Sequence, residues 1–181
     1  MENNLINQLN ASKILVRKMR TQVEKIQDKK FKAIVFDLDG MIVVGEIFTK
    51  RLEKEYSIPA KISVEFFEKE FQDCKLGKKD LKEELEKYLK EWNWSGTVDE
   101  LLDFWFEGNP IDERFFPVIS KLKSKGIKCV LATNQAKTRA EYYKKKLARV
   151  FDCEFHSCEI GALKPSKEFF DVVFEKLNIK P

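Results

Sequence analysis

Phe31-Lys-Ala-Ile-Val-Phe-Asp-Leu-Asp-Gly40 is the stretch of sequence that decides the fold. Its first six residues form a short apolar run with β-branched side chains, and the run stops at a turn that contains a glycine. A run of this length and composition predicts a buried β-strand over residues 31–36. Two carboxylates, Asp37 and Asp39, follow at the C-terminal end of this strand. Open α/β sheets bind their ligands at that end.

A second apolar run, Ile127–Ala132, ends at Thr133 and Asn134. A helix that closes on Gly126 is expected before it, because glycine is a common helix C-terminal signal. Further elements are predicted as helices over residues 137–148 and 167–177 and a short strand over residues 153–155. Alternation of strands and helices predicts an α/β fold, a Rossmann-like parallel sheet with right-handed crossovers.

The two strands are separated by far more chain than one crossover needs. Asp37 and Thr133 lie 96 residues apart, whereas a βαβ unit needs about 30. The surplus, residues 45–110, has apolar side chains at helical spacing and breaks at glycines and prolines. We therefore predict a helical cap over residues 45–110, inserted into a core made of residues 31–44 and 111–181.

The first 30 residues are predicted to form one helix. Six of their seven heptad a and d positions are apolar, namely Leu5, Leu9, Val16, Met19, Val23 and Ile26. Such a stripe either packs against the helix's own domain or forms a dimer contact with a second copy. The sequence leaves both interpretations open.

Composition excludes several classes of protein. The 181 residues carry a formal net charge of +4, with 35% charged and 43% hydrophobic residues. No run reaches the roughly 18–20 apolar residues of a membrane span, and the dispersed charge gives no footprint for nucleic acid. The four cysteines lack a disulfide-framework spacing. We expect a cytoplasmic protein without nucleic-acid or membrane partners.

The polar residues after the two strands suggest phosphate chemistry. Asp37 and Asp39 can converge on one point, and carboxylate oxygens are ligands for Mg²⁺, which recruits phosphate. An aspartate can also act as a nucleophile, although a lone pair of this kind is often only an acidic turn. Thr133 and Asn134 suit a phosphoryl oxygen, or Thr133 could simply cap the next helix. Lys164, before Pro165 in a loop, could place a positive charge over the site or lie on the surface.

Taken together, the three motifs Phe-Asp-Leu-Asp-Gly (residues 36–40), Leu-Ala-Thr-Asn (131–134) and Gly-Ala-Leu-Lys-Pro-Ser (161–166) resemble the haloacid dehalogenase (HAD) superfamily of hydrolases. The resemblance covers residues 31 to 181, and the helical insert resembles the first cap type of that family. It implies a HAD-like Rossmann core with an α-helical cap.

The resemblance also implies a role for each matched residue. Asp37 would be the nucleophile and a Mg²⁺ ligand. Asp39 would be the general acid and base, and its backbone carbonyl would also bind the metal. Thr133 and the backbone of Asn134 would hold the phosphoryl group, and Lys164 would neutralise its charge.

These roles imply a Mg²⁺-dependent phosphatase that hydrolyses a small phosphomonoester through an aspartyl-phosphate. Family members that cleave carbon–halogen bonds lack an aspartate at the position of Asp39, which favours phosphatase over dehalogenase. A phosphomutase of the same superfamily remains open, as does a non-catalytic binding or oligomerisation module.

One family feature is missing from the sequence. The fourth motif is an acidic pair that ends a further strand, whereas the acidic residues after Lys164 lie on the last predicted helix: Glu168, Asp171 and Glu175. Three interpretations follow, namely a fragment that lacks its C-terminal part, a truncated inactive product, or a chain completed by a partner. Without the further strands of the family, residues 31–36 become an exposed apolar sheet edge, which invites aggregation or pairing with another chain. We expect the chain alone to have little or no phosphatase activity.

Overall fold

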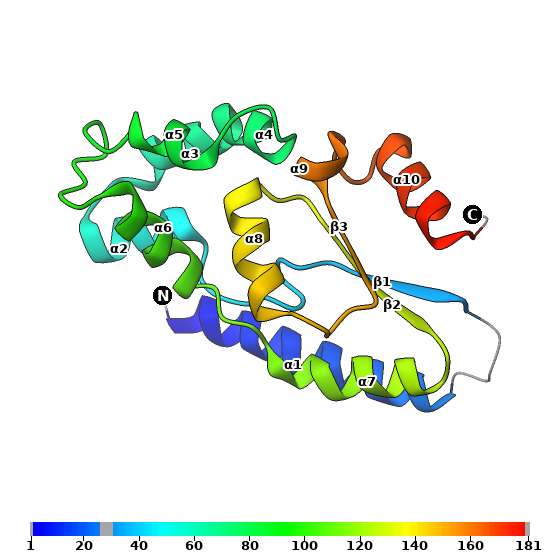
Figure 1. The fold of residues 1–181 in the computed structure, drawn as a ribbon. Coiled ribbons are helices and arrows are strands. Elements are labelled where there is room, and N and C mark those ends of the chain that lie inside the picture. Colours follow the sequence, from blue (N-terminus) through cyan, green and yellow to red (C-terminus); the bar gives the residue numbers. More distant parts are fainter. Residues whose placement is uncertain (1, 26–30, 180–181) are drawn as a thin grey trace.

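The computed structural model describes residues 2–25 and 31–179, which form three parallel strands and their surrounding helices (Figure 1). The strands are β1 (Ala33–Phe36), β2 (Lys128–Thr133) and β3 (Cys153–His156). The helices are α1 (Glu2–Lys25), α2 (Phe48–Tyr56), α3 (Ala60–Glu68), α4 (Glu70–Lys75), α5 (Leu81–Glu86), α6 (Val98–Glu107), α7 (Phe116–Ser124), α8 (Lys137–Lys146), α9 (Ser157–Ile160) and α10 (Lys167–Leu177), with the 3-10 turn η1 (Glu113–Phe115) before α7. This mixed α/β architecture with a parallel sheet confirms the predicted fold class.

The sheet has the order β1-β2-β3, and all its strand pairs are parallel. In register, Phe36 pairs with Leu131, and Thr133 at the end of β2 pairs with His156 at the end of β3. The C-terminal ends of β1 and β2 therefore lie next to each other. The polar residues that follow these two strands meet at that edge.

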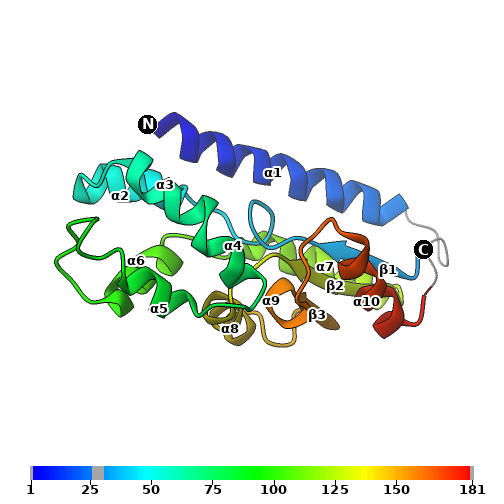
Figure 2. The same ribbon diagram turned by 90° about the horizontal axis from the view of Figure 1, so that it is seen from above.

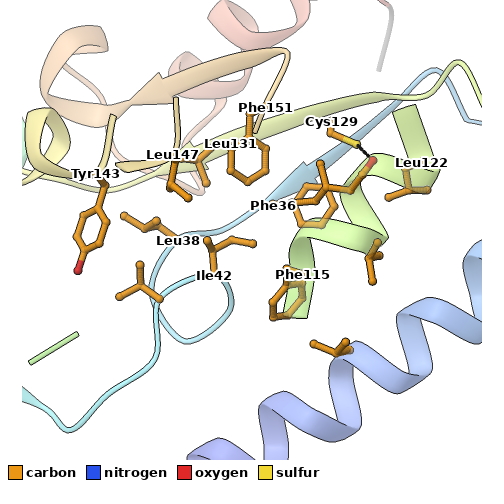
Figure 3. Packing of buried hydrophobic residues seen from close by; sticks show 14 of the residues in the cluster. Phe36, Leu38, Ile42, Phe115, Leu122, Cys129, Leu131, Tyr143, Leu147 and Phe151 are labelled. Atoms are coloured by element: carbon orange, nitrogen blue, oxygen red, sulfur yellow. Dashed lines mark hydrogen bonds between the residues drawn. The ribbon is translucent and has the colours of Figure 1, made fainter. Parts of the chain in front are cut away.

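Side chains of β2 alternate between the two faces of the sheet, as its pleat requires. Cys129 and Leu131 face one cluster, which includes residues of α1, α7 and α8, whereas Val130 and Ala132 face α10 on the other side. Figure 3 shows the first cluster, in which the ring of Phe36 lies against that of Phe151 with centroids 5.7 Å apart. Helices thus cover both faces of the short sheet.

β1 lies at an edge of this sheet rather than at its centre. The side chain of Phe36 is buried, but Val35 is 43% exposed. The prediction of a fully buried strand from its apolar run is therefore wrong for Val35. The expectation of an apolar sheet edge agrees with this exposure, within the part of the chain that the structure describes.

Helix α1 packs on its own chain. Val16 and Val23 are buried in the cluster that also contains residues of α7, and Leu15 and Met19 pack against it. Ser12, at the heptad position that lacks an apolar side chain, is also buried and donates a hydrogen bond to Asp112. The predicted stripe residues Leu5, Leu9 and Ile26 lie outside the residues whose side chains the structure describes.

The helices between β1 and β2 surround a hydrophobic cluster of their own. Phe66 and Trp92 are buried at its centre, and their rings meet edge to face with centroids 5.9 Å apart. The backbone of Lys69 adopts φ −111° and ψ −91°, which ends α3 and starts α4. Figure 1 shows these helices beyond the C-terminal ends of the strands.

Two chain segments connect this helical region to the sheet, and they run side by side. Val43 forms an antiparallel bridge with Ile111, and the amide of Val44 donates to the carbonyl of Pro110 at 3.0 Å. Asn109 Nδ2 donates to the carbonyl of Glu46 at 3.3 Å and so links the two segments again. The helical region is therefore joined to the sheet through a narrow, paired connection.

No helix within residues 2–25 and 31–179 is both long and apolar enough to cross a membrane.

Candidate functional site

The ends of β1 and β2 bring Asp37, Asn134 and Lys164 together. Lys164 Nζ lies 2.9 Å from Asp37 Oδ2 and donates to the carbonyl of Ala132 at 2.6 Å. The amide of Asn134 holds the backbone of Lys164 from both sides: Nδ2 donates to its carbonyl at 3.0 Å, and Oδ1 accepts from its amide at 2.8 Å. The loop before α10 is thereby fixed so that its lysine faces the nucleophile candidate.

Asp37 presents one carboxylate oxygen to this lysine and the other to its own chain. Asp37 Oδ1 accepts a hydrogen bond from the amide of Leu38 at 2.7 Å, and half of the Asp37 side chain is exposed. A tight turn follows, in which the amide of Gly40, with φ +74°, donates to the carbonyl of Val43. Glycine suits this turn because it adopts positive φ without steric cost. Asp39 directly precedes Gly40 in this turn, and its carboxylate has other partners than Lys164.

Asp39 instead pairs with a buried arginine of α8. Arg139 Nη2 lies 2.7 Å from Asp39 Oδ1, and Nη1 lies 3.0 Å from Oδ2, which is a bidentate contact. Gln135 Nε2 also donates to Asp39 Oδ2, and Gln135 Oε1 accepts from Arg139 Nη1 at 2.6 Å. The orientation of the Asp39 carboxylate is therefore set by two side chains, Gln135 just before α8 and Arg139 within it.

Thr133 is connected to this second group through Gln135. Gln135 Nε2 lies 3.2 Å from Thr133 Oγ1, whose side chain is buried. The alternative that Thr133 caps the next helix is wrong, because the N-cap of α8 is Ala136, which makes no side-chain cap hydrogen bond. The five residues singled out from the sequence thus form two adjacent groups, one around Lys164 and one around Arg139.

Arg139 is charged despite its burial. Only 3% of this residue is exposed, and its guanidinium carbon lies 4.9 Å from the ring centroid of Tyr143. Burial alone would lower the pKa of Arg139, but the charge of Asp39 and its hydrogen bonds outweigh that effect and raise the pKa. Burial raises the pKa of Tyr143 to about 12, so this phenol keeps its proton and donates to the carbonyl of Asn109 at 2.8 Å.

A cavity of about 430 Å³ opens between the sheet end and the helical region. Asp39 and Asn134 line its polar side, whereas Asp37 is absent from its lining. The opposite wall is aromatic and comes from α2, α3, α4 and α6: Phe48, Phe67, Phe71 and Trp105. Ala11 of α1 also lines the cavity, and Figure 2 shows α1 running from the helical region along the molecule toward β1.

The oxygen donors at this edge of the sheet are suited to Mg²⁺. Among the described residues, no three His, Cys, Asp or Glu side chains gather into a cluster that could hold a metal ion. Mg²⁺ keeps several waters and needs only one or two carboxylates when a substrate phosphate supplies further ligands. The half-exposed carboxylate of Asp37 provides one such oxygen, so the donor chemistry fits Mg²⁺, with a single carboxylate as the protein anchor.

Two residues of the site, Gln135 and Arg139, were not predicted from the sequence. Arg139 precedes Tyr143 and Leu147 at intervals of four residues, and all three are buried. An arginine in the buried stripe of a helix needs a partner for its charge. Its position in that stripe could therefore have identified Arg139 as a candidate site residue. The partner, Asp39, could not be identified because it lies a hundred residues away.

The chain matches the family of haloacid dehalogenase-like hydrolases over residues 31–181. None of the curated proteins matches it. Several solved structures have a similar fold. One is a HAD family enzyme from Bacteroides thetaiotaomicron in complex with magnesium, which is 20% identical and has a TM-score of 0.69, with 84% of this chain and 81% of that chain covered.

Two further solved structures are similar to this chain. A protein of Porphyromonas gingivalis described as a predicted HAD-like family hydrolase is 20% identical, with a TM-score of 0.65 over 83% of this chain and 78% of that chain. L-2-haloacid dehalogenase from Xanthobacter autotrophicus, with chloropropionic acid covalently bound, is 17% identical, with a TM-score of 0.58 over 83% of this chain and 66% of that chain. At these identities the structures establish the fold, while the family match covers most of the sequence. This chain belongs to the haloacid dehalogenase-like hydrolase family.

Proposed function

We propose that the site hydrolyses a small phosphomonoester with Mg²⁺, through phosphoryl transfer to Asp37. The observation that carries this proposal is the 2.9 Å contact between Lys164 Nζ and Asp37 Oδ2, with Asp39 two residues further at the edge of the cavity. A carboxylate beside a fixed cation is suited to attack phosphorus while the cation stabilises the charge of the phosphoryl oxygens.

In the first step, a carboxylate oxygen of Asp37 attacks phosphorus, and the bond from phosphorus to the leaving oxygen breaks. Asp39 gives a proton to that oxygen, so an alcohol leaves and an aspartyl-phosphate remains. In the second step, water attacks phosphorus, Asp39 takes its proton, and the bond to Asp37 breaks. Phosphate leaves, and both aspartates return to their starting forms.

Mg²⁺, held by the Asp37 carboxylate and the backbone carbonyl of Asp39, would neutralise charge on the phosphoryl oxygens. Thr133 and the backbone of Asn134 would bind those oxygens from the end of β2. We expect little steady-state turnover by the chain alone, because among the described residues Asp37 is the one carboxylate placed to anchor the metal. Helices α2–α6 would act as a cap that keeps bulk water away from the phosphoryl group.

Asp39 favours phosphate esters over halides as substrates. An alkoxide is a poor leaving group and needs a proton, whereas a halide leaves without one. Arg139 and Gln135 hold the Asp39 carboxylate at the border between Asp37 and the cavity. That is the place where a leaving oxygen would lie if the phosphoryl group were bound at Asp37.

The proposal is tested under single-turnover conditions, which do not require fast catalysis. The protein is mixed with a limiting amount of p-nitrophenyl phosphate and Mg²⁺, and nitrophenol release and the mass gain of one phosphoryl group are followed. We expect both signals from the wild-type chain and neither from Asp37→Asn. Asp171→Asn, an exposed change on α10, should behave as wild type. Absence of both signals in the wild type, or their persistence in Asp37→Asn, would overturn the proposal.

A further inference from the structure

The cavity beside Asp39 is placed to receive the group that leaves the phosphate. Asp39 and Asn134 belong to its lining, whereas Asp37, Thr133 and Lys164 do not. A phosphoryl group at Asp37 would therefore lie outside the cavity, and the rest of the substrate would extend past Asp39 into it. The chemistry of this cavity consequently bears on the class of substrate. This argument rests on the proposed function.

The wall that faces Asp39 is a connected aromatic surface with Trp105 at its centre. The rings of Phe48 and Trp105 are stacked, with centroids 4.9 Å apart and planes inclined by 23°. Phe67 and Phe71 approach the same indole, with centroids at 5.2 and 5.5 Å. Trp105 and Phe48 are almost completely buried, while Phe67 and Phe71 are partly exposed. A planar apolar group can stack on such a surface.

The charged side chains of the cavity lining already have partners. Asp39 and Arg139 pair with each other, and Glu46 Oε2 lies 3.7 Å from Lys54 Nζ. A charged leaving group would lose its water without gaining a free counter-charge, which is costly. The lining therefore disfavours substrates with a second charge far from the phosphate.

Most of the polar atoms of the three amide side chains in the lining are also engaged, and Asn109 Nδ2 donates to the carbonyl of Glu46. Both polar atoms of Asn134 bond to the backbone of Lys164. Gln135 donates to Asp39 and accepts from Arg139. A sugar or polyol needs several free hydrogen-bond partners to replace its water. Among the described side chains of the lining, the Thr49 hydroxyl and Asn109 Oδ1 are left for that purpose, which is fewer than such a group needs.

We propose that the cavity takes an uncharged aromatic leaving group, so that the substrate is an aryl or arylalkyl phosphomonoester. The volume of about 430 Å³ is ample for such a group, since an apolar cavity of about 150 Å³ holds benzene. Trp105 is the specificity-determining residue, because its indole touches each of the other three rings of the wall.

The experiment compares benzylphosphonate with 2-hydroxyethylphosphonate, which carry the same charged group and cannot be hydrolysed. Dissociation constants are measured by calorimetry with Mg²⁺ present. We expect benzylphosphonate to bind about tenfold more tightly or better. Trp105→Leu should remove most of this preference, and Trp105→Phe should keep part of it. Trp94→Leu is the matched control, because Trp94 belongs to the same helical region but does not line the cavity.

Binding of benzyl alcohol, followed by tryptophan fluorescence, separates this inference from the proposed function. If benzyl alcohol binds in a Trp105-dependent way but neither phosphonate binds better than the alcohol, the phosphatase proposal fails and the aromatic cavity stands. If the two phosphonates bind equally, or if Trp105→Leu retains the full preference while its circular dichroism shows a folded protein, the aromatic specificity is wrong. A protein that binds none of the three compounds overturns both.

Discussion

The ammonium nitrogen of Lys164 lies 2.9 Å from the Oδ2 atom of Asp37 and 2.6 Å from the carbonyl oxygen of Ala132. One side chain thus contacts the end of β1 and the end of β2. The two amide hydrogen bonds from Asn134 fix the backbone from which this side chain extends. The position of the cation is therefore determined by the sheet and not by the loop alone.

Lys164→Met should slow phosphoryl transfer to Asp37 by about 10²–10³-fold, because one preorganised charge is lost from the reacting group. The rate is measured as formation of the phosphorylated protein in a single turnover. Lys167→Met is the matched control, since this exposed lysine on α10 pairs with Asp171 at 2.6 Å and lies outside the site. Equal rates for Lys164→Met and wild type would contradict the assigned role.

Arg139→Lys tests the orientation of Asp39. Lysine keeps the positive charge but cannot make the bidentate contact to a carboxylate. We expect a loss of about tenfold to a hundredfold in the transfer rate through misplacement of the proton donor. Thermal unfolding should show that the protein stays folded. Arg17→Lys on the exposed face of α1 should leave the rate unchanged, and a wild-type rate in Arg139→Lys would show that the bidentate contact is unimportant.

Asp112 should make the stability of the fold depend on pH. Burial would raise the pKa of this carboxyl, but hydrogen bonds from Arg114 and Ser12 outweigh it, so its pKa is lowered. A lowered pKa in the folded state stabilises the protein above the ordinary value of about 4, and this contribution is lost as the pH falls through the folded value.

Asp112→Asn should therefore reduce the free energy of unfolding by about 2 kcal/mol at neutral pH, and less at lower pH as the wild type loses its advantage. Urea unfolding at a series of pH values measures this difference. Asp99→Asn, which removes an exposed pair with Lys82, should cost under about 1 kcal/mol. If the difference in unfolding free energy between wild type and Asp112→Asn grew toward acid pH, the pKa of Asp112 would not be lowered in the folded state.

Gly45→Ala should disturb the connection between the helical region and the sheet. A Cβ atom at residue 45 would collide with the carbonyl oxygen of Gly108 and lie 2.7 Å from Asn109 Nδ2. Because the obstacle includes backbone, we expect a loss of at least about 2 kcal/mol in unfolding free energy. Gly126→Ala is the comparison, since its Cβ meets no atom within 4 Å and only its φ of +76° is unfavourable. Similar losses in the two variants would contradict the steric explanation.

The sequence contained enough information for the sheet and for the helices that flank it. Helix α10 spans the predicted residues 167–177, and the Oγ atom of Ser166 caps it by accepting from the amide of Phe169. The short apolar segment at residues 153–155 predicted the third strand, and the structure has β3 at Cys153–His156. Such elements depend on local patterns and neighbouring caps, which the sequence displays directly.

Two helix boundaries and one contact of the site could not be predicted from local sequence patterns. The helix predicted over residues 137–148 ends at Lys146, because the last turn gives way to the bend that leads into β3. No proline or glycine lies at Lys69, so the sequence does not indicate the break between α3 and α4. The pair between Asp39 and Arg139 joins residues a hundred positions apart, so spacing alone could not reveal that Asp39 faces α8.

Helix α1 has a practical consequence for anyone who trims the gene to the family match. The match begins at residue 31, but Val16 and Val23 lie in the larger hydrophobic cluster and Ala11 lines the cavity. A clone that starts at residue 31 would yield a protein that exposes the hydrophobic surface under α1 and lacks part of the cavity wall. We expect such a protein to aggregate during purification, and ligand binding measured on it would report on a cavity that lacks part of its wall.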